Sequence, residues 1–158
     1  MPAKKGEKVE LTLPMIFIIV TAILFLDQFS KFILTRYLTA NQSIPLIKGW
    51  FYLTLIHNKG AAFGILRNQA PLFISTSVFA IILIWFNLKK NKHRKLYSIA
   101  LSLILAGAGG NLIDRLFFGY VIDFLDLRIW PVFNIADSAI TIGAILLGWE
   151  IFFKKDVS

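Results

Sequence analysis

Four long stretches with few or no charged residues constrain the fold of this chain more than any other feature. They cover residues 11–26, 71–88, 96–113 and 135–153. A helix that crosses a bilayer needs about 20 mainly apolar residues. The chain is 57% hydrophobic and only 16% charged, with a mean hydropathy of +0.70, whereas soluble domains carry about 25% charged residues. The sequence therefore predicts a mainly α-helical integral membrane protein.

We expect one domain, residues 1–158, with four transmembrane helices at about 11–34, 71–88, 96–115 and 135–153. The first uncharged run has 16 residues, and a helix that continues to about residue 34 places Asp27 and Lys31 at its far end. A basic start followed by an apolar run also fits a cleaved signal peptide. No A-x-A-like cleavage site follows, and three more apolar runs do, so we favour a span.

Lysine and arginine are concentrated in three clusters, and four spans place all three clusters on one side of the membrane. Clusters of this kind mark cytoplasmic loops that face anionic lipid, so the net charge of +8 does not imply nucleic-acid binding. We predict cytoplasmic termini and a cytoplasmic loop 89–95, with 35–70 and 115–134 on the outside. The cluster residues are Lys4, Lys5, Lys8, Lys89, Lys90, Lys92, Arg94, Lys95, Lys154 and Lys155.

The first predicted outer segment, 35–70, differs from the apolar runs. Phe51, Leu53 and Leu55 alternate with other side chains, as in a strand. Neighbouring aromatic residues such as Trp50 are typical of a membrane interface. We therefore expect a small extracytoplasmic β-rich segment on the membrane surface, in which 44–66 holds substrate and Asn58 binds the substrate backbone.

The polar residues of the apolar chain gather on this same predicted side. Four spans need not place their polar residues at one level, and ionisable groups within membrane segments usually mark function. The sequence therefore predicts one site near the outer interface, in which most polar groups come from residues 107–140. Its candidate residues are Asp27, Asn58, Asn111, Asp114, Arg115, Asp123, Asn134 and Asp137.

Most candidates also have a purely structural interpretation. Asn134 is placed to cap a helix, with Asp137 completing a capping-box-like turn three residues later. Asp114 and Arg115 could form a local polar cluster with Asn111. Asp27 and Lys31, four residues apart, could be an ordinary helical ion pair. The capping and catalytic roles of the Asn134–Asp137 pair are compatible. We expect Asp126 and Arg128 to be solvated loop residues.

Several kinds of chemistry lack the residues that they need. The chain has no cysteine, and neither His57 nor His93 has partners at metal-ligand spacing. Ser30 and Lys31 are helix neighbours whose side chains diverge. GAGG at 107–110 lacks the spacing of a nucleotide-binding loop. We expect no metal and no cofactor. Two carboxylates that share one proton remain, and such a pair can activate a water and protonate a leaving group.

Five motifs occur in one order along the chain: LDQFSK at 26–31, NKGAAFG at 58–64, GGNLIDR at 109–115, VIDF at 121–124 and FNIADSAI at 133–140. In these motifs the sequence closely resembles the prolipoprotein signal peptidases, also called signal peptidase II. The resemblance implies an aspartic endopeptidase of the bacterial inner membrane. It implies that this enzyme removes signal peptides from prolipoproteins just before a cysteine that carries a diacylglyceryl group.

Carried over by motif, the catalytic pair is Asp123 and Asp137. The resemblance also implies lipid-modified prolipoprotein substrates, contact with membrane lipid, no nucleic acid and a monomer. Asp114 is an alternative to Asp123, but its adjacent arginine and helical position suit a structural role. The expected substrate-binding or supporting residues are Asn58, Gly60, Asn111, Asp114, Arg115 and Asn134, with Asp27 and Lys31 stabilising the fold or the site.

The segment between the two aspartates is short. Only thirteen residues separate Asp123 from Asp137, fewer than the resemblance leads us to expect, so the loop over the site is shortened. We expect Asp123 to lie in a loop beside apolar residues, which favours its protonated form. We expect Asp137 to lie in a first helical turn, which favours an anion.

Two other functions use the same residues. A four-span transporter could use the aspartates as an ion relay, but the inner halves of the spans are apolar apart from Asn87 and Glu150. A non-catalytic assembly factor would leave the carboxylate cluster without a purpose. The sequence therefore favours an enzyme.

Overall fold

The computed structural model describes residues 11–60, 69–91 and 94–153. Within these ranges, four helices are each long and apolar enough to cross a membrane: α1 (Leu13–Tyr37), α2 (Ala70–Lys90), α3 (Lys95–Phe118) and α4 (Ile135–Phe153). A helix is present at each of the four predicted spans, and the first three helices end two or three residues later than expected. Several predicted features lie outside the described residues: Lys4, Lys5, Lys8, Lys92, His93, Lys154, Lys155 and residues 61–64 of the NKGAAFG motif.

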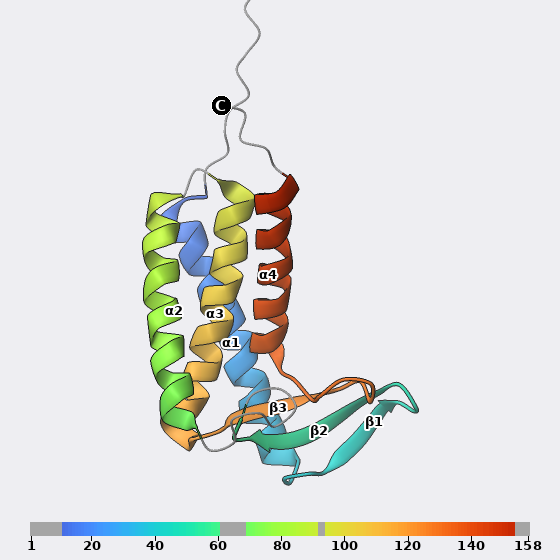
Figure 1. Cartoon of the computed structure of the whole chain (residues 1–158). Helices are drawn as coiled ribbons and strands as arrows, with labels where there is room; N and C mark the ends of the chain where they lie inside the picture. The colour runs from blue at the N-terminus through green and yellow to red at the C-terminus, as the bar shows by residue number, and fades with distance from the viewer. Residues whose placement is uncertain (1–10, 61–68, 92–93, 154–158) are drawn as a thin grey trace, which may run out of the picture.

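The helices form one bundle in which α3 packs against each of the other three (Figure 1). Glycines bring the backbones of α3 and α4 together. A Cβ on Gly107 would collide with the carbonyl oxygen of Ala136, and one on Gly143 would lie 2.7 Å from the carbonyl oxygen of Ala100. Such close approach is the usual role of small residues between membrane helices. It fixes the first turn of α4 against the middle of α3.

A three-stranded antiparallel sheet lies across one end of the bundle (Figure 1). Its strands are β1 (Ser43–Ile47), β2 (Phe51–Asn58) and β3 (Val121–Asp126), in the order β1-β2-β3. Pro45 is tolerated because β1 is an edge strand, where a missing N–H breaks no inner ladder. The expected sheet is present over residues 43–58, whereas residues 61–66 of the expected segment lie outside the described residues. Its third strand comes from the segment that precedes α4.

Strand β3 corrects the expectation that Asp123 lies in a loop. Gly119 ends α3 in a left-handed conformation, at φ 77°, and the chain turns directly into β3. Asp123 then pairs with Ile56, and Val121 pairs with Asn58. The strand is buried along nearly its whole length. It therefore lacks the polar–apolar alternation that identifies a half-exposed strand in a sequence.

The expected solvation of Asp126 is also wrong. Its side chain is buried at the end of β3, where Thr54 Oγ1 donates a hydrogen bond to Asp126 Oδ2 at 2.6 Å. The backbone N–H of Arg128 donates to Asp126 Oδ1 at 2.9 Å. A buried carboxylate needs such donors, and Thr54 is supplied by a strand far away in the sequence.

Candidate active site

A cavity of about 600 Å³ lies where the sheet meets the bundle. Asp123, from the middle of β3, and Asp137, from the first turn of α4, both line it. Asn58, Gly60, Asn111 and Arg115 line it as well. The structure therefore brings together, at one cavity, residues that the sequence places on four separate segments.

Asparagine side chains hold both carboxylates of the pair. Asp123 accepts a hydrogen bond at each oxygen, from Asn134 Nδ2 and from Asn58 Nδ2, both at 2.8 Å. Asp137 Oδ1 accepts one from Asn111 Nδ2 at 2.7 Å. The two sides are joined, because Asn134 Nδ2 also donates to Asn111 Oδ1 at 3.1 Å. Neutral amides thus orient two acids without neutralising them.

Asn134 has a second function as the cap of α4. Its Oδ1 accepts the backbone N–H of Asp137 at 2.8 Å, and Asp137 Oδ2 accepts the backbone N–H of Asn134 at 3.3 Å. This reciprocal arrangement is a capping box, which satisfies N–H groups that the first helical turn leaves unpaired. The predicted cap is confirmed, and it fixes the rotamer of Asp137.

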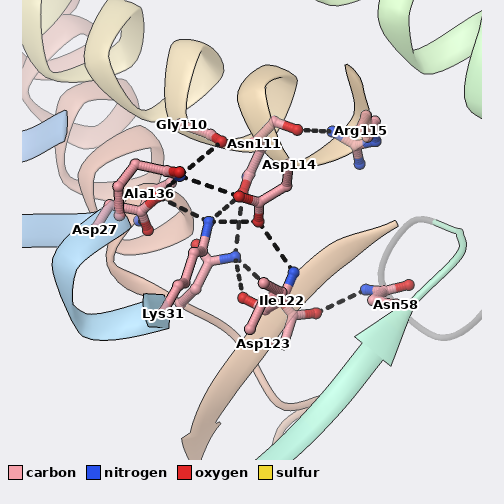
Figure 2. Close-up of polar contacts among 12 residues, drawn as sticks. Asp27, Lys31, Asn58, Gly110, Asn111, Asp114, Arg115, Ile122, Asp123 and Ala136 are labelled. Atoms are coloured by element: carbon pink, nitrogen blue, oxygen red, sulfur yellow. Dashed lines mark hydrogen bonds and ion pairs between the residues drawn. The ribbon is translucent and has the colours of Figure 1, made fainter. Parts of the chain in front are cut away.

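Behind the cavity, Lys31 joins two buried aspartates (Figure 2). Its Nζ lies 2.7 Å from Asp27 Oδ2 and 2.8 Å from Asp114 Oδ2, and the lysine is only 2% exposed. Asp27 and Asp114 are fully buried. The expected helical ion pair between Asp27 and Lys31 is therefore present, but it is part of a three-residue cluster. We call Asp27, Lys31 and Asp114 the buried ion cluster.

The buried ion cluster holds the backbone next to both aspartates of the cavity. Asp27 Oδ1 accepts the N–H of Ala136 at 2.9 Å, one residue before Asp137. Asp114 Oδ2 accepts the N–H of Ile122 at 3.0 Å, one residue before Asp123. One ion cluster therefore sets the separation of β3 from the start of α4. The Asp114 carboxylate contacts Lys31 and the Ile122 N–H. Asp114 does not line the cavity, unlike Asp123.

Arg115 is on the cavity side of α3, next in sequence to the buried Asp114. Its Nη1 donates to the carbonyl oxygen of Asn111 at 3.5 Å, and its guanidinium lies over the ring of Phe73, 4.8 Å from the centroid. The cavity thus has a cation that faces two acids. Asn58, for which we expected contact with substrate, already uses its amide on Asp123 and accepts the N–H of Gly60 at its Oδ1.

The surroundings of Asp123 shift its pKa so that the carboxyl group can exchange a proton near neutral pH. Its pKa is raised from 3.8 to about 7, first because burial disfavours the charged form and second because the charge of Asp137 lies nearby. Hydrogen bonds from Asn58 and Asn134 and the charge of Lys31 oppose the rise. Strongly shifted carboxyl groups in cavities are candidates for acid–base catalysis. Asp123 can therefore hold a proton at pH 7.

Sequence reasoning missed several parts of the site. Gln28 Nε2 lies within hydrogen-bonding distance of Asp27, Asp114 and the carbonyl oxygen of Gly110. Its only sequence signal is its place after Asp27 in the first motif. Thr76 and Ser77 line the cavity from α2, and the polar run 75–77 in an otherwise apolar helix is a signal for them. Trp130 and Phe133 line it from the segment before α4.

The histidine described by the structure takes no part in the cavity lining. His57 stacks on Tyr120, with ring centroids 4.3 Å apart. Among residues 11–60, 69–91 and 94–153, no group of three or more His, Asp or Glu side chains is arranged to hold a metal ion. The polar groups that line the cavity include carboxylate, amide, guanidinium and hydroxyl groups.

Comparison with known proteins relates this arrangement to one family. The family model described as signal peptidase (SPase) II matches residues 19–153. A lipoprotein signal peptidase from Caldanaerobacter subterraneus subsp. tengcongensis is 46% identical over 144 residues, which cover 90% of this chain and 99% of the relative. One from Moorella thermoacetica is 49% identical over 130 residues, covering 82% and 87%.

Solved structures agree with the sequence comparisons. One is described as a bacterial membrane enzyme structure determined by the in meso method at 2.3 Å resolution. It matches with a TM-score of 0.85 and 32% identity, covering 94% of this chain and 96% of that chain. A second, at 1.9 Å, has the same TM-score and 31% identity, covering 95% and 100%. This multi-pass membrane protein belongs to the signal peptidase II family, the peptidases that remove signal peptides from prolipoproteins.

Proposed function

We propose that Asp123 and Asp137 form an aspartic dyad, which hydrolyses the peptide bond before the lipid-bearing cysteine of diacylglyceryl-modified prolipoproteins. One observation carries the proposal. Two carboxyl groups from separate elements line the same cavity, and a continuous set of asparagine hydrogen bonds connects them. A pair of this kind can divide general-base and general-acid work between its members.

In the proposed resting state the two aspartates share one proton. Burial and the Asp137 charge raise the pKa of Asp123 to about 7, so Asp123 can hold the shared proton. Asp137 lies in the first turn of α4, where the positive end of the helix dipole favours an anion. The titration belongs to the pair, so the assignment describes the more populated state.

The proposed reaction transfers protons between water, the two aspartates and the substrate. The Asp137 carboxylate takes a proton from a water, whose oxygen attacks the carbonyl carbon of the scissile bond. Asp123 gives its proton toward the carbonyl oxygen of the tetrahedral intermediate, and the proton held by Asp137 passes to the leaving nitrogen as the C–N bond breaks. Collapse of the intermediate to the acid returns a proton to Asp123. Arg115, on the cavity wall, supplies positive charge beside the developing oxyanion.

The shape of the cavity suits a signal peptide. Ile104 lines it seven residues before Asn111 on α3, a distance of about 10 Å along the helix axis. Ala80, from α2, and Thr141, from α4, line it too. It therefore extends from the sheet into the apolar part of the bundle, where the apolar core of a signal peptide can lie. Both carboxyl groups come from one chain, so the proposal requires only a monomer in contact with membrane lipid.

The same proposal includes an orientation. The exposed Lys89 and Lys90 end α2 at the end of the bundle opposite the sheet (Figure 1). Lysine clusters favour the cytoplasmic side. The active site would then face the outside of the bacterial inner membrane, with both termini in the cytoplasm.

Purified protein in detergent tests the proposal against a matched pair of substrates. The expected result is cleavage of a diacylglyceryl-modified prolipoprotein, with the new N-terminus at the lipid-bearing cysteine, and little cleavage of the unmodified precursor. EDTA should leave the rate unchanged, because the proposed chemistry uses only side chains and water. Loss of cleavage with EDTA, or equal cleavage of the unmodified precursor, would overturn the mechanism or the substrate assignment respectively.

A further inference from the structure

The segment 127–132 forms one wall of the cavity, and we call it the wall loop. Trp130, Pro131 and Val132 line the cavity, while Leu127 and Trp130 also line an adjoining pocket of about 350 Å³. An antiparallel bridge closes the base of the loop. Leu125 N–H donates to the Phe133 oxygen at 2.7 Å, and Phe133 N–H donates to the Leu125 oxygen at 3.0 Å. The position of this loop therefore determines the shape of both spaces.

Arg128 has an unusual backbone conformation within the wall loop. Its φ is 64°, in the left-handed region that glycine adopts freely and that costs energy for a residue with a Cβ. Its N–H donates to Asp126 Oδ1 at 2.9 Å. An arginine in this position requires contacts that outweigh the strain, and the side chain supplies them.

The Arg128 side chain contacts all three strands. Its guanidinium carbon lies over the ring of Tyr52 in β2, 3.6 Å from the centroid. Its Nη2 donates to Ser43 Oγ in β1 at 2.8 Å, and its Nε lies 3.6 Å from Asp126 Oδ2 in β3. Ser43 and Asp126 are themselves joined through Thr54 Oγ1, at 2.8 and 2.6 Å. One side chain thus attaches the wall loop to the sheet.

We propose that Arg128 is a positioning residue that holds the wall loop against the sheet and so keeps the substrate cavity in shape. It touches neither member of the dyad. The inference rests on the proposed function of the cavity as the substrate site. Both oxygens of Asp123 receive their hydrogen bonds from Asn58 and Asn134, so the catalytic groups stay in place without Arg128.

A split between KM and kcat follows from this geometry. Loss of the guanidinium removes a cation–π contact and a hydrogen bond to Ser43, so the wall loop samples other positions and substrate binds less tightly. We expect KM to rise about three- to tenfold. Turnover of bound substrate, kcat, should stay within about twofold, because the dyad keeps its own hydrogen bonds.

Three substitutions at Arg128 separate the effect of its side-chain contacts from the effect of its backbone strain. Arg128→Ala removes the contacts but keeps the strained φ, whereas Arg128→Gly removes the contacts and relieves the strain, so it remains informative if the alanine variant fails to fold. Arg128→Lys keeps the charge but loses the flat fork that stacks on Tyr52 and reaches Ser43. Arg36→Ala is the matched control. It removes an arginine that lies over an aromatic ring, that of Phe32, from the end of α1, away from the wall loop.

A spin label measures the mobility of the wall loop directly. The chain has no cysteine, so Ile129→Cys, at a side chain 90% exposed, gives a single labelling site in the wall loop. In detergent, the electron paramagnetic resonance line shape should sharpen in the Arg128→Gly and Arg128→Lys backgrounds and stay unchanged in Arg36→Ala. A sharper line means a more mobile loop.

The outcomes separate this inference from the proposed function. A raised KM with a preserved kcat and a sharper line shape supports it. A wild-type KM in Arg128→Gly, or a fall in kcat with KM unchanged, overturns it while cleavage by the wild type leaves the proposed function intact. If the wild type fails to cleave, or Asp123→Asn cleaves equally well, the proposed function fails. In that case the line shape is the remaining test of the positioning role. An unchanged line shape in Arg128→Gly overturns that role.

Discussion

Asn134 and Asp137 cap each other at the start of α4, through hydrogen bonds of 2.8 Å to Asn134 Oδ1 and 3.3 Å to Asp137 Oδ2. The same Asn134 donates from Nδ2 to Asp123 Oδ1 at 2.8 Å. In an ordinary helix such a residue only caps the first turn. Here Asn134 also orients both members of the proposed dyad. The cap of α4 and the proposed site therefore depend on the same side chain.

The buried ion cluster should determine the stability of the whole site. Lys31→Ala leaves Asp27 and Asp114 buried without their shared cation, and breaking such a pair costs about 3–5 kcal/mol. We expect the free energy of unfolding, measured in detergent with denaturant, to fall by about that amount. Lys48→Ala, at an exposed lysine of the β1–β2 turn, should change it by less than about 0.5 kcal/mol. Equal stability of the two variants would mean that the cluster does not hold the fold.

Gly110 should tolerate no side chain, because α1 packs directly against it. A Cβ there would lie 2.6 Å from Asp27 Oδ2 and 3.2 Å from the Ala136 Cβ. Gly110→Ala should displace the Asp27 carboxylate and lower the unfolding free energy by about 1–3 kcal/mol. Gly148→Ala in α4 meets nothing within 4 Å and should raise it by about 0.5–1 kcal/mol. Thermal unfolding of both variants measures the contrast, and a neutral Gly110→Ala would contradict the close packing.

Stability and activity should depend on the protonation of Asp123. Its carboxyl loses a proton near pH 3.8 when the chain is unfolded but near 7 in the folded protein. Between these values the folded state binds the proton more tightly, so stability falls as the pH rises. Asp123→Asn removes this loss. We compare the unfolding free energy of Asp123→Asn with that of the wild type at each pH. The difference, variant minus wild type, should be about 1–4 kcal/mol larger at pH 8 than at pH 4.

Cleavage by the wild type should likewise decline as the pH rises through about 7, where Asp123 gives up its proton. Unfolding measured in detergent from pH 4 to 8, beside the pH profile of cleavage, checks both expectations. Parallel stability curves for Asp123→Asn and the wild type would show that Asp123 is not protonated in the folded protein at neutral pH.

The helical part of the fold could be predicted because it follows from local sequence. Each span is a long apolar run, and the cap at Asn134 needs only residues three positions apart. Strand β3 could not be predicted, because it is buried along nearly its whole length and its partner β2 lies more than 60 residues earlier. Its residues show no alternation, so Asp123 was expected in a loop.

The candidate site could be predicted as a set of residues but not as a set of contacts. Topology alone placed the carboxylates and asparagines on one side of the membrane. It could not show that Lys31 pairs with Asp114 as well as Asp27, since that pairing depends on how α1 and α3 pack. For the same reason the burial of Asp126 beside Thr54 could not be predicted. Arg128 is exposed, as expected, but its hydrogen bond to Ser43 across the sheet could not be predicted either.

The proposed orientation predicts opposite labelling at the two ends of the bundle. Lys48 is exposed beside the sheet, and Lys90 is exposed at the end of α2. The chain has no native cysteine, so Lys48→Cys and Lys90→Cys each give a single reactive thiol. A membrane-impermeant thiol reagent whose access to the outer face of the inner membrane is established should label position 48 and not 90. The reverse pattern would invert the topology.

Single-turnover cleavage of a diacylglyceryl-modified prolipoprotein by Asp123→Asn and Asp137→Asn tests the aspartic dyad most directly. An amide has nearly the shape of the carboxyl group but can neither take nor supply the proton, so each variant should lose cleavage by a factor of about 10²–10⁴. Asp126→Asn, in the same strand but outside the cavity lining, should keep kcat within about tenfold of the wild type, as expected for a residue that supports the sheet. Near-native cleavage by Asp123→Asn, together with loss in Asp114→Asn, would contradict the dyad and move the chemistry to the buried ion cluster.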